Sequence, residues 1–89
     1  MKSVMTLEED RCFLCGRYGQ MECHHIFGGA NRINSTKYGL VVPLCHNEPP
    51  DGVHFNREKM DDLKARGQRK FESIWDHETF MKIFGENYI

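Results

Sequence analysis

The stretch Glu22-Cys23-His24-His25-Ile26 organises this chain of 89 residues, together with Leu44-Cys45-His46 and Gly52-Val53-His54. Four of the five histidines lie in these three segments. Each of them stands beside apolar or turn-forming residues, which can hold an imidazole ring in a fixed position. We therefore expect one composite site that binds a single divalent metal ion.

Two short strands are expected on either side of a turn-rich loop. Residues 21–26 and 38–44 are rich in apolar and β-branched side chains, and the loop 28–35 between them is rich in Gly and Asn. This pattern is typical of a β-hairpin. Because successive side chains of a strand leave opposite faces, His24 and His25 cannot both point at one ion, and we expect them to have two different roles.

A long helix is expected from about Val53, followed by a short helix that ends at Phe84. Apolar residues three or four apart predict a buried stripe on the long helix, made of Met60, Leu63, Gly67, Phe71 and Ile74. The aromatic Trp75 is expected in the core as well. Glycine weakens a helix by about 1 kcal/mol relative to alanine, so Gly67 predicts a kink or close packing. Asp76 can cap the final helix, which Gly85 would end.

Cys12-Phe13-Leu14-Cys15 has the spacing of a zinc knuckle, in which two thiolates converge on one ion. In a reducing compartment four cysteines bind metal more often than they form disulfides. The other ligands must come from elsewhere in the chain. Cys45, which closes the second strand, is the first candidate and Cys23 is the second. A structural zinc ion at these four cysteines is one interpretation, and buried free thiols are the other.

A chain of this length forms one domain with a modest core. We expect a flexible N-terminal arm at residues 1–10 and a single domain at residues 11–89. Within it, the knuckle and hairpin span 11–45, a loop and the long helix span 46–75, and the C-terminal helix spans 76–89.

The net charge of −1 excludes a uniformly basic surface. Lys and Arg nevertheless outnumber Asp and Glu between residues 11 and 70, so one basic face is consistent with the sequence. The apolar runs are too short to span a bilayer, and the N-terminus lacks the pattern of a secretory signal. We therefore expect a cytoplasmic protein.

With these motifs the chain resembles the HNH endonucleases, in particular the small members that phages often encode. The resemblance covers roughly residues 11–72. It rests on the paired histidines after a Cys-x-x-Cys, the Gly-rich loop from Phe27 to Asn31, the run from Gly39 to His46, and Gly-Val-His-Phe-Asn at 52–56. It implies an α+β fold with a ββα-metal core (the His-Me finger), a long helix and a C-terminal helix. It also implies hydrolysis of DNA phosphodiester bonds, in the host cytoplasm if the gene belongs to a phage.

The same resemblance assigns roles to the histidines. His24, His46 and His54 would bind the metal, with Asn56 as the reserve ligand, and His25 would be the general base that activates water. The ion would be Mg²⁺, Mn²⁺, Ni²⁺ or Zn²⁺, and a second, structural zinc would lie at the cysteines.

Many HNH proteins carry an asparagine just before the second strand that orients the base. Here Gly39 or Leu40 occupies that place, so either Asn34 or Asn31 substitutes for it or this orienting side chain is missing.

DNA is the expected partner, and a homodimer or a phage DNA-processing complex is the expected assembly. Basic side chains of the long helix are candidates for contacts to the DNA backbone, although a solvated helix face is the alternative: Arg57, Lys64, Arg66 and Lys70. Two other functions stay open. One is a non-catalytic zinc-binding adaptor for nucleic acid or protein. The other is a nuclease subunit that is active only within a larger phage packaging or recombination complex.

Overall fold

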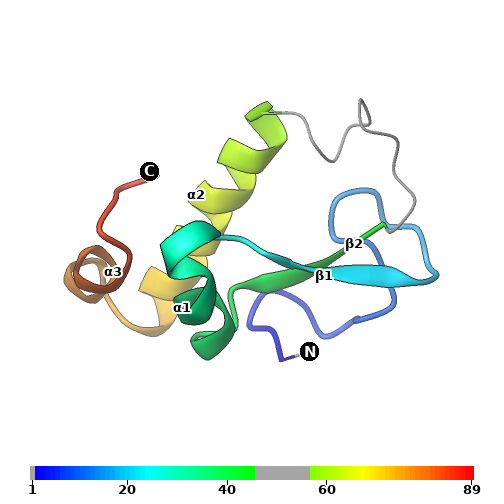
Figure 1. Cartoon of the computed structure of the whole chain (residues 1–89), viewed down its shortest axis with the longest axis horizontal. Helices are drawn as coiled ribbons and strands as arrows, with labels where there is room; N and C mark the ends of the chain where they lie inside the picture. The colour runs from blue at the N-terminus through cyan, green and yellow to red at the C-terminus, as the bar shows by residue number, and fades with distance from the viewer. Residues whose placement is uncertain (1, 46–56) are drawn as a thin grey trace.

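The computed structural model describes residues 2–45 and 57–89. Its elements follow in the order β1 (Met21–His25), the 3-10 helix η1 (Gly29–Asn31), α1 (Arg32–Lys37), β2 (Val41–Cys45), α2 (Arg57–Ile74) and α3 (His77–Phe84). The described residues therefore form a small mixed α/β fold with a two-stranded antiparallel sheet and three α-helices (Figure 1). The expected start of the long helix near Val53 lies outside the described residues.

The expected pairing of the two strands is confirmed. β1 and β2 are antiparallel, with Met21 opposite Cys45 and His25 opposite Val41. Pro43 lies within β2, and Phe13 N–H donates to its carbonyl at the outer edge of the strand. The nitrogen of a strand residue faces the same edge as its carbonyl, so the missing N–H of Pro43 removes no bond to β1.

The connection between the strands differs from the expected open loop, because residues 29–37 form η1 and α1. Ser35 explains this difference. Its side chain is fully buried, and its hydroxyl donates to the Phe27 carbonyl at 2.8 Å and accepts from the Phe27 N–H at 3.0 Å. A Gly-, Asn- and Ser-rich sequence reads as a loop because these side chains bond locally. Here the hydroxyl bonds to distant backbone instead and anchors the helix.

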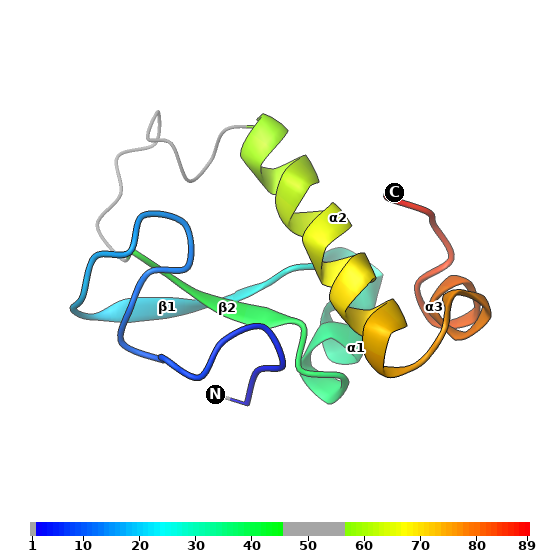
Figure 2. The ribbon, with the colours of Figure 1, turned by 180° about the vertical axis from the view of Figure 1, so that it is seen from behind.

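The N-terminal segment lies along the outer edge of β2 (Figure 2). Three successive outward carbonyls receive donors: Val4 N–H bonds to Gly39, the Ser3 hydroxyl bonds to Val41, and Phe13 N–H bonds to Pro43. An exposed strand edge would leave these carbonyls open to pairing with another chain. Residues 2–10, for which the sequence predicts a flexible arm, therefore contribute to covering this edge.

The core lies between the sheet and the helices. Leu63 and Phe71 of α2 pack with Val42 of β2 in one buried cluster. A Cβ atom added to Gly67 would lie 3.1 Å from Ile26 Cγ2 and 3.3 Å from Phe27 Cε2, so the close packing expected at this glycine is confirmed.

Two core predictions at the end of α2 are wrong. Ile74 is 47% exposed and Trp75 is 42% exposed. Four residues after Phe71, Trp75 returns to the same side of the helix and packs on Phe71 and Tyr38, with ring centroids 4.6 and 5.3 Å apart. Around the helix axis, Ile74 is rotated by about 60° from Phe71, in the direction opposite to the rotation of Trp75. That side of the helix is exposed where α2 ends.

The C-terminal helix forms as expected. The Asp76 carboxylate accepts a hydrogen bond from Thr79 N–H at 2.7 Å, and Gly85 ends α3 with φ of 79°. Phe80 and Phe84 are buried, and both rings pack against Phe27 from the first turn after β1. None of the helices in the described residues combines the length and the apolar character that crossing a bilayer requires.

Candidate functional site

Three cysteines gather at the end of the sheet. The Sγ atoms of Cys12, Cys15 and Cys45 all lie within 4.8 Å of one another, and those of Cys15 and Cys45 are 3.3 Å apart. With Zn–S bonds of about 2.3 Å, tetrahedral sulfur ligands are about 3.8 Å apart. The three thiols are therefore close enough to bind one metal ion.

The electrostatics of the cluster favour a bound cation. Burial alone would raise the pKa of Cys12, but the backbone N–H groups of Cys15, Leu14 and Cys45 outweigh it and lower this pKa to about 6. Cys12 is thus a thiolate at neutral pH. The pKa of Cys45 is raised to about 12, first by its side-chain hydrogen bond with Cys15 and then by burial. Several thiolates cannot share this space unless a cation neutralises them.

The fourth expected cysteine does not join this cluster. Cys23 is exposed and stands opposite Pro43 in the strand register, whereas Cys45 stands opposite Met21. Within residues 2–45 and 57–89 the metal-competent group is therefore made of three thiols, without a fourth protein ligand.

His24 lies on the face of β1 that is turned toward α2. It stands opposite Val42, which packs in the same cluster as Leu63 of α2. Burial lowers the pKa of His24, and the nearby charges of His25 and Lys64 lower it further. The ring is therefore neutral at pH 7, which is the state in which imidazole binds a metal. No hydrogen bond engages the His24 ring within the described part of the chain.

His25 leaves β1 on the opposite face, as the alternation of the strand requires. Its Nε2 atom lies 2.9 Å from Thr36 Oγ1 on α1. The Thr36 hydroxyl donates its proton to the Arg32 carbonyl at 3.2 Å, so it accepts from Nε2–H of His25. The lone pair of the ring then lies on Nδ1. Burial and the charge of Arg32 lower the pKa of His25, which keeps this lone pair available at neutral pH.

Thr36, and neither of the two asparagines named in the sequence analysis, contacts the His25 ring. Asn31 and Asn34 do not bond to His25: the Asn31 amide donates to the Phe84 carbonyl, and the Asn34 amide donates to Asn31 and Ile83. Both amides therefore connect η1 and α1 to the end of α3. Sequence reasoning missed Thr36 because it predicted a loop at residues 28–35 and not the helix α1. Thr36 lies in the last turn of that helix.

The basic residues of α2 differ in their surroundings. Arg57 forms a 3.8 Å ion pair with Asp61, and Arg66 a 4.0 Å pair with Asp62. The Arg66 guanidinium also lies 4.7 Å from the centroid of the Phe13 ring, and the Lys64 ammonium lies 5.6 Å from that of Tyr88. Lys70 is exposed. Exposed pairs of this kind are weak, so these side chains can exchange their partners for phosphate.

The remaining candidates are placed as follows. His46, His54 and Asn56 lie outside the described residues, which end at Cys45 and resume at Arg57. His77 is on α3, where its Nδ1 atom lies 2.7 Å from Glu72. It is therefore a surface histidine that contacts Glu72.

Comparisons of the chain with protein-family models, with curated proteins and with solved structures found no match.

Proposed function

We propose that this protein is a metal-dependent endonuclease of the HNH kind, which hydrolyses DNA phosphodiester bonds, and that β1, β2 and α2 form its ββα-metal core. One observation carries the proposal. Two adjacent histidines of β1 have different surroundings: His24 faces α2 without a hydrogen bond to the described residues, and His25 is held by Thr36 on the other face. A metal ligand and a general base require this difference.

His24 would hold the metal together with His46 and His54, as the resemblance to HNH nucleases implies. Neutral imidazoles suit first-row divalent ions, and His24 is held neutral by its surroundings. The ion, when bound, supplies positive charge beside the scissile phosphate and its leaving oxygen.

His25 acts on the water. Its Nδ1 atom accepts a proton while the water oxygen bonds to phosphorus, the bond from phosphorus to the 3′ oxygen breaks, and the leaving 3′ oxygen takes a proton from a solvent water. The products then carry 5′-phosphate and 3′-hydroxyl ends. Thr36 holds Nε2–H, so the ring keeps the tautomer in which Nδ1 is the base. The charge of Arg32, on the same side, favours the neutral ring and the approach of a phosphate.

We further propose that the Cys12, Cys15 and Cys45 thiolates hold a structural zinc ion. Such an ion would tie the knuckle to the last residue of β2, directly before His46. A chain of this size gains stability from a metal that closes a loop of about 30 residues. It would also fix the direction in which the chain leaves the sheet toward the remaining ligands.

The cysteine cluster also supports a second candidate function, a non-catalytic zinc-binding adaptor for nucleic acid or protein. In that case all metal binding would be structural, and His25 would have no chemical role. A nuclease subunit that works only inside a larger phage complex is a variant of the first proposal. These functions differ in what the isolated chain does to DNA.

The test is cleavage of supercoiled plasmid by the purified chain with Mg²⁺, Mn²⁺, Ni²⁺ or Zn²⁺, together with a count of bound ions. We expect nicked or linear DNA from the wild type and a loss of about 100- to 10,000-fold in rate for His25→Ala. His77→Ala is the matched control, because it removes an exposed histidine that pairs with Glu72. The control should cleave at the wild-type rate.

The outcomes separate the candidates. Cleavage that survives His25→Ala overturns the proposed base. If the chain binds one zinc ion but cuts no DNA with any metal, the adaptor is favoured. If cleavage appears only after a phage lysate fraction is added, and His25→Ala abolishes it, the chain is the nuclease subunit of a complex.

A further inference from the structure

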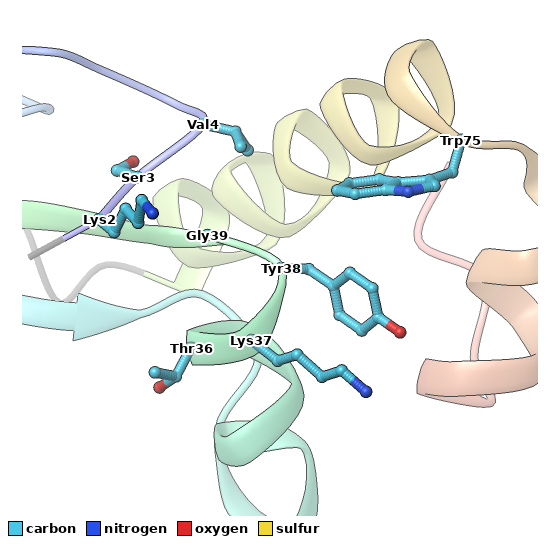
Figure 3. Close-up of a pocket in the computed structure, with 8 residues that line it drawn as sticks. All are labelled: Lys2, Ser3, Val4, Thr36, Lys37, Tyr38, Gly39 and Trp75. Carbon is cyan, nitrogen blue, oxygen red and sulfur yellow. The ribbon is translucent and has the colours of Figure 1, made fainter.

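A pocket of about 360 Å³ lies between the N-terminal segment and the end of α2 (Figure 3). The Trp75 indole extends over it toward Val4, Tyr38 forms one wall, and Gly39 lies beside Val4. Small-molecule sites in proteins begin at about 300 Å³ and are mostly apolar with a few polar groups. This pocket therefore has room for one small planar ligand.

The polar groups of the pocket suit an anionic ligand that contains an aromatic ring. Lys2 and Lys37 line it, none of the acidic side chains that the structure describes does, and neither lysine forms an ion pair with a described carboxylate. The Trp75 indole N–H and the Tyr38 hydroxyl have no hydrogen-bond partner among the described residues. Asp76 follows Trp75 in the chain, but its carboxylate is engaged in capping α3.

We propose that this pocket binds one unpaired nucleotide of a DNA strand, with the base against Trp75 and the flanking phosphates on Lys2 and Lys37. Aromatic side chains next to cationic ones are the usual means of holding unpaired bases, because every base has a π-face and carries phosphates beside it. The pocket is distinct from the proposed metal ligands, and this inference rests on the proposed function, since it assumes that DNA is the substrate.

Thr36 connects the pocket to the proposed reaction. It lines the pocket, and the same side chain holds Nε2 of His25 at 2.9 Å. In Figure 3, Thr36 lies at the end of the pocket opposite to Trp75, with Lys2 and Ser3. A strand with a nucleotide against Trp75 would then extend toward Thr36 and the proposed base His25, which Thr36 contacts. The pocket would then select substrates with an unpaired base beside the scissile bond, such as branched or frayed DNA.

The chain carries a built-in reporter for the test, because Trp75 is its one tryptophan. The full chain with His25→Ala, which binds without cutting, is titrated with oligothymidylate while its fluorescence is recorded. We expect quenching by the single strand and much weaker quenching by a blunt duplex of the same length. Quenching by a strand of abasic phosphodiesters that equals quenching by oligothymidylate overturns stacking. Equal affinity for thymidine monophosphate overturns the strand as the ligand.

Variants separate stacking from charge. Anisotropy of a labelled oligothymidylate should show binding that is about 5- to 150-fold weaker for Trp75→Leu, with partial recovery for Trp75→Phe. Lys37→Gln and Lys2→Gln should each reduce the slope of log affinity against log salt by about 0.7, the value for one phosphate contact on a single strand. Lys59→Gln is the control and should leave the slope unchanged. Lys59 is exposed and lies about 24 Å from Trp75 along the helix axis.

The results also distinguish failure of this inference from failure of the nuclease proposal. Quenching by single strands, when the wild type cleaves no plasmid either alone or with the lysate fraction, supports the pocket and removes the nuclease. Plasmid cleavage without quenching keeps the nuclease and overturns the pocket. Preference for an acidic peptide over oligothymidylate also overturns the pocket as a nucleotide site. Thermal unfolding of each variant identifies those that fail to fold, and the quenching of the His25→Ala chain, whose pocket residues are unaltered, decides without them.

Discussion

The Nε2 atom of His25 on β1 lies 2.9 Å from the Oγ1 atom of Thr36 on α1, eleven residues further along the chain. Thr36 also donates to the Arg32 carbonyl, so its hydroxyl fixes which ring nitrogen of His25 carries the proton. The His25 ring, for which we propose the role of general base, is thereby oriented by the helix that connects the two strands.

Replacing Thr36 by valine tests this orientation. Valine keeps the branched shape but removes the hydroxyl, so the His25 ring can turn and exchange tautomers. We expect the cleavage rate to fall about 10- to 100-fold, the usual effect of losing a partner that orients a functional histidine. The fall should lie in kcat and not in KM, and Thr36→Ser should restore most of it. Wild-type kcat in the valine variant would mean that the contact has no catalytic role.

The pH dependence of cleavage follows from the surroundings of His25. Burial and then the charge of Arg32 lower its pKa below the usual 6.5. Since the neutral ring is the form that the proposed mechanism requires, we expect activity to be present above the folded pKa and lost as pH falls through it. We expect the acidic limb of log kcat/KM to bend below pH 6.5. Arg32→Gln should move the bend to higher pH, and a bend that stays in place would exclude Arg32 as a cause.

The affinity of the cysteine cluster for zinc should rise with pH, because zinc and protons compete for the same sulfur atoms. Cys12, with a pKa of about 6, is already a thiolate at pH 7.5, whereas Cys45, with a pKa of about 12, must lose its proton to bind. We therefore expect proton release on binding and an affinity that falls at least about tenfold for each pH unit of acidification. Calorimetry in buffers of different ionisation enthalpy measures this release.

Serine variants of the cluster test the proposed zinc site, and a serine variant of Cys23 is the matched control. Cys12→Ser and Cys45→Ser should each abolish stoichiometric zinc binding and lower the thermal midpoint of the zinc-loaded protein. Cys23→Ser should change neither, because Cys23 stands opposite Pro43 and outside the group. Loss of zinc in the Cys23 variant would show that this thiol is a ligand after all.

Ser35→Ala should destabilise the protein by about 2 to 3 kcal/mol. The substitution leaves both the N–H and the carbonyl of Phe27 without their bonds to the Ser35 hydroxyl, in a place with no exposure to solvent. Urea denaturation of the wild type and the variant measures the difference. Ser73→Ala is the control, since the Ser73 hydroxyl is exposed and bonds only within its own helix. Equal stability of the two variants would contradict the anchoring role of Ser35.

Gly67→Ala tests the packing of α2 on the chain after β1. Alanine would favour the helix by about 1 kcal/mol, but its Cβ would lie 3.1 Å from Ile26 Cγ2. Overpacking of this kind costs about 1 to 3 kcal/mol, and Ile26 is buried and has little room to move. We expect a net loss of about 1 kcal/mol in unfolding free energy. Lys70→Ala, at an exposed position of the same helix, should stay within about 0.5 kcal/mol of wild type.

Sequence alone determined the elements whose signals are local. Runs of apolar and β-branched residues predicted β1 and β2, and the alternation of side chains along a strand predicted the divergence of His24 from His25. The three- and four-residue steps predicted the buried side of α2 at Leu63 and Phe71. Asp76 and Gly85 set the ends of α3 because capping depends on residues within one turn.

Tertiary structure decided what depends on distant partners. Ser35 turned an apparent loop into a helix through two bonds to Phe27, and that helix brought Thr36 to His25. Cys12 and Cys15 met Cys45, and not Cys23, because the register placed Cys23 opposite Pro43. The physical reason is the same in each case: which polar groups meet across the fold is set by pairing register and packing, and neither is written in the spacing of neighbouring residues.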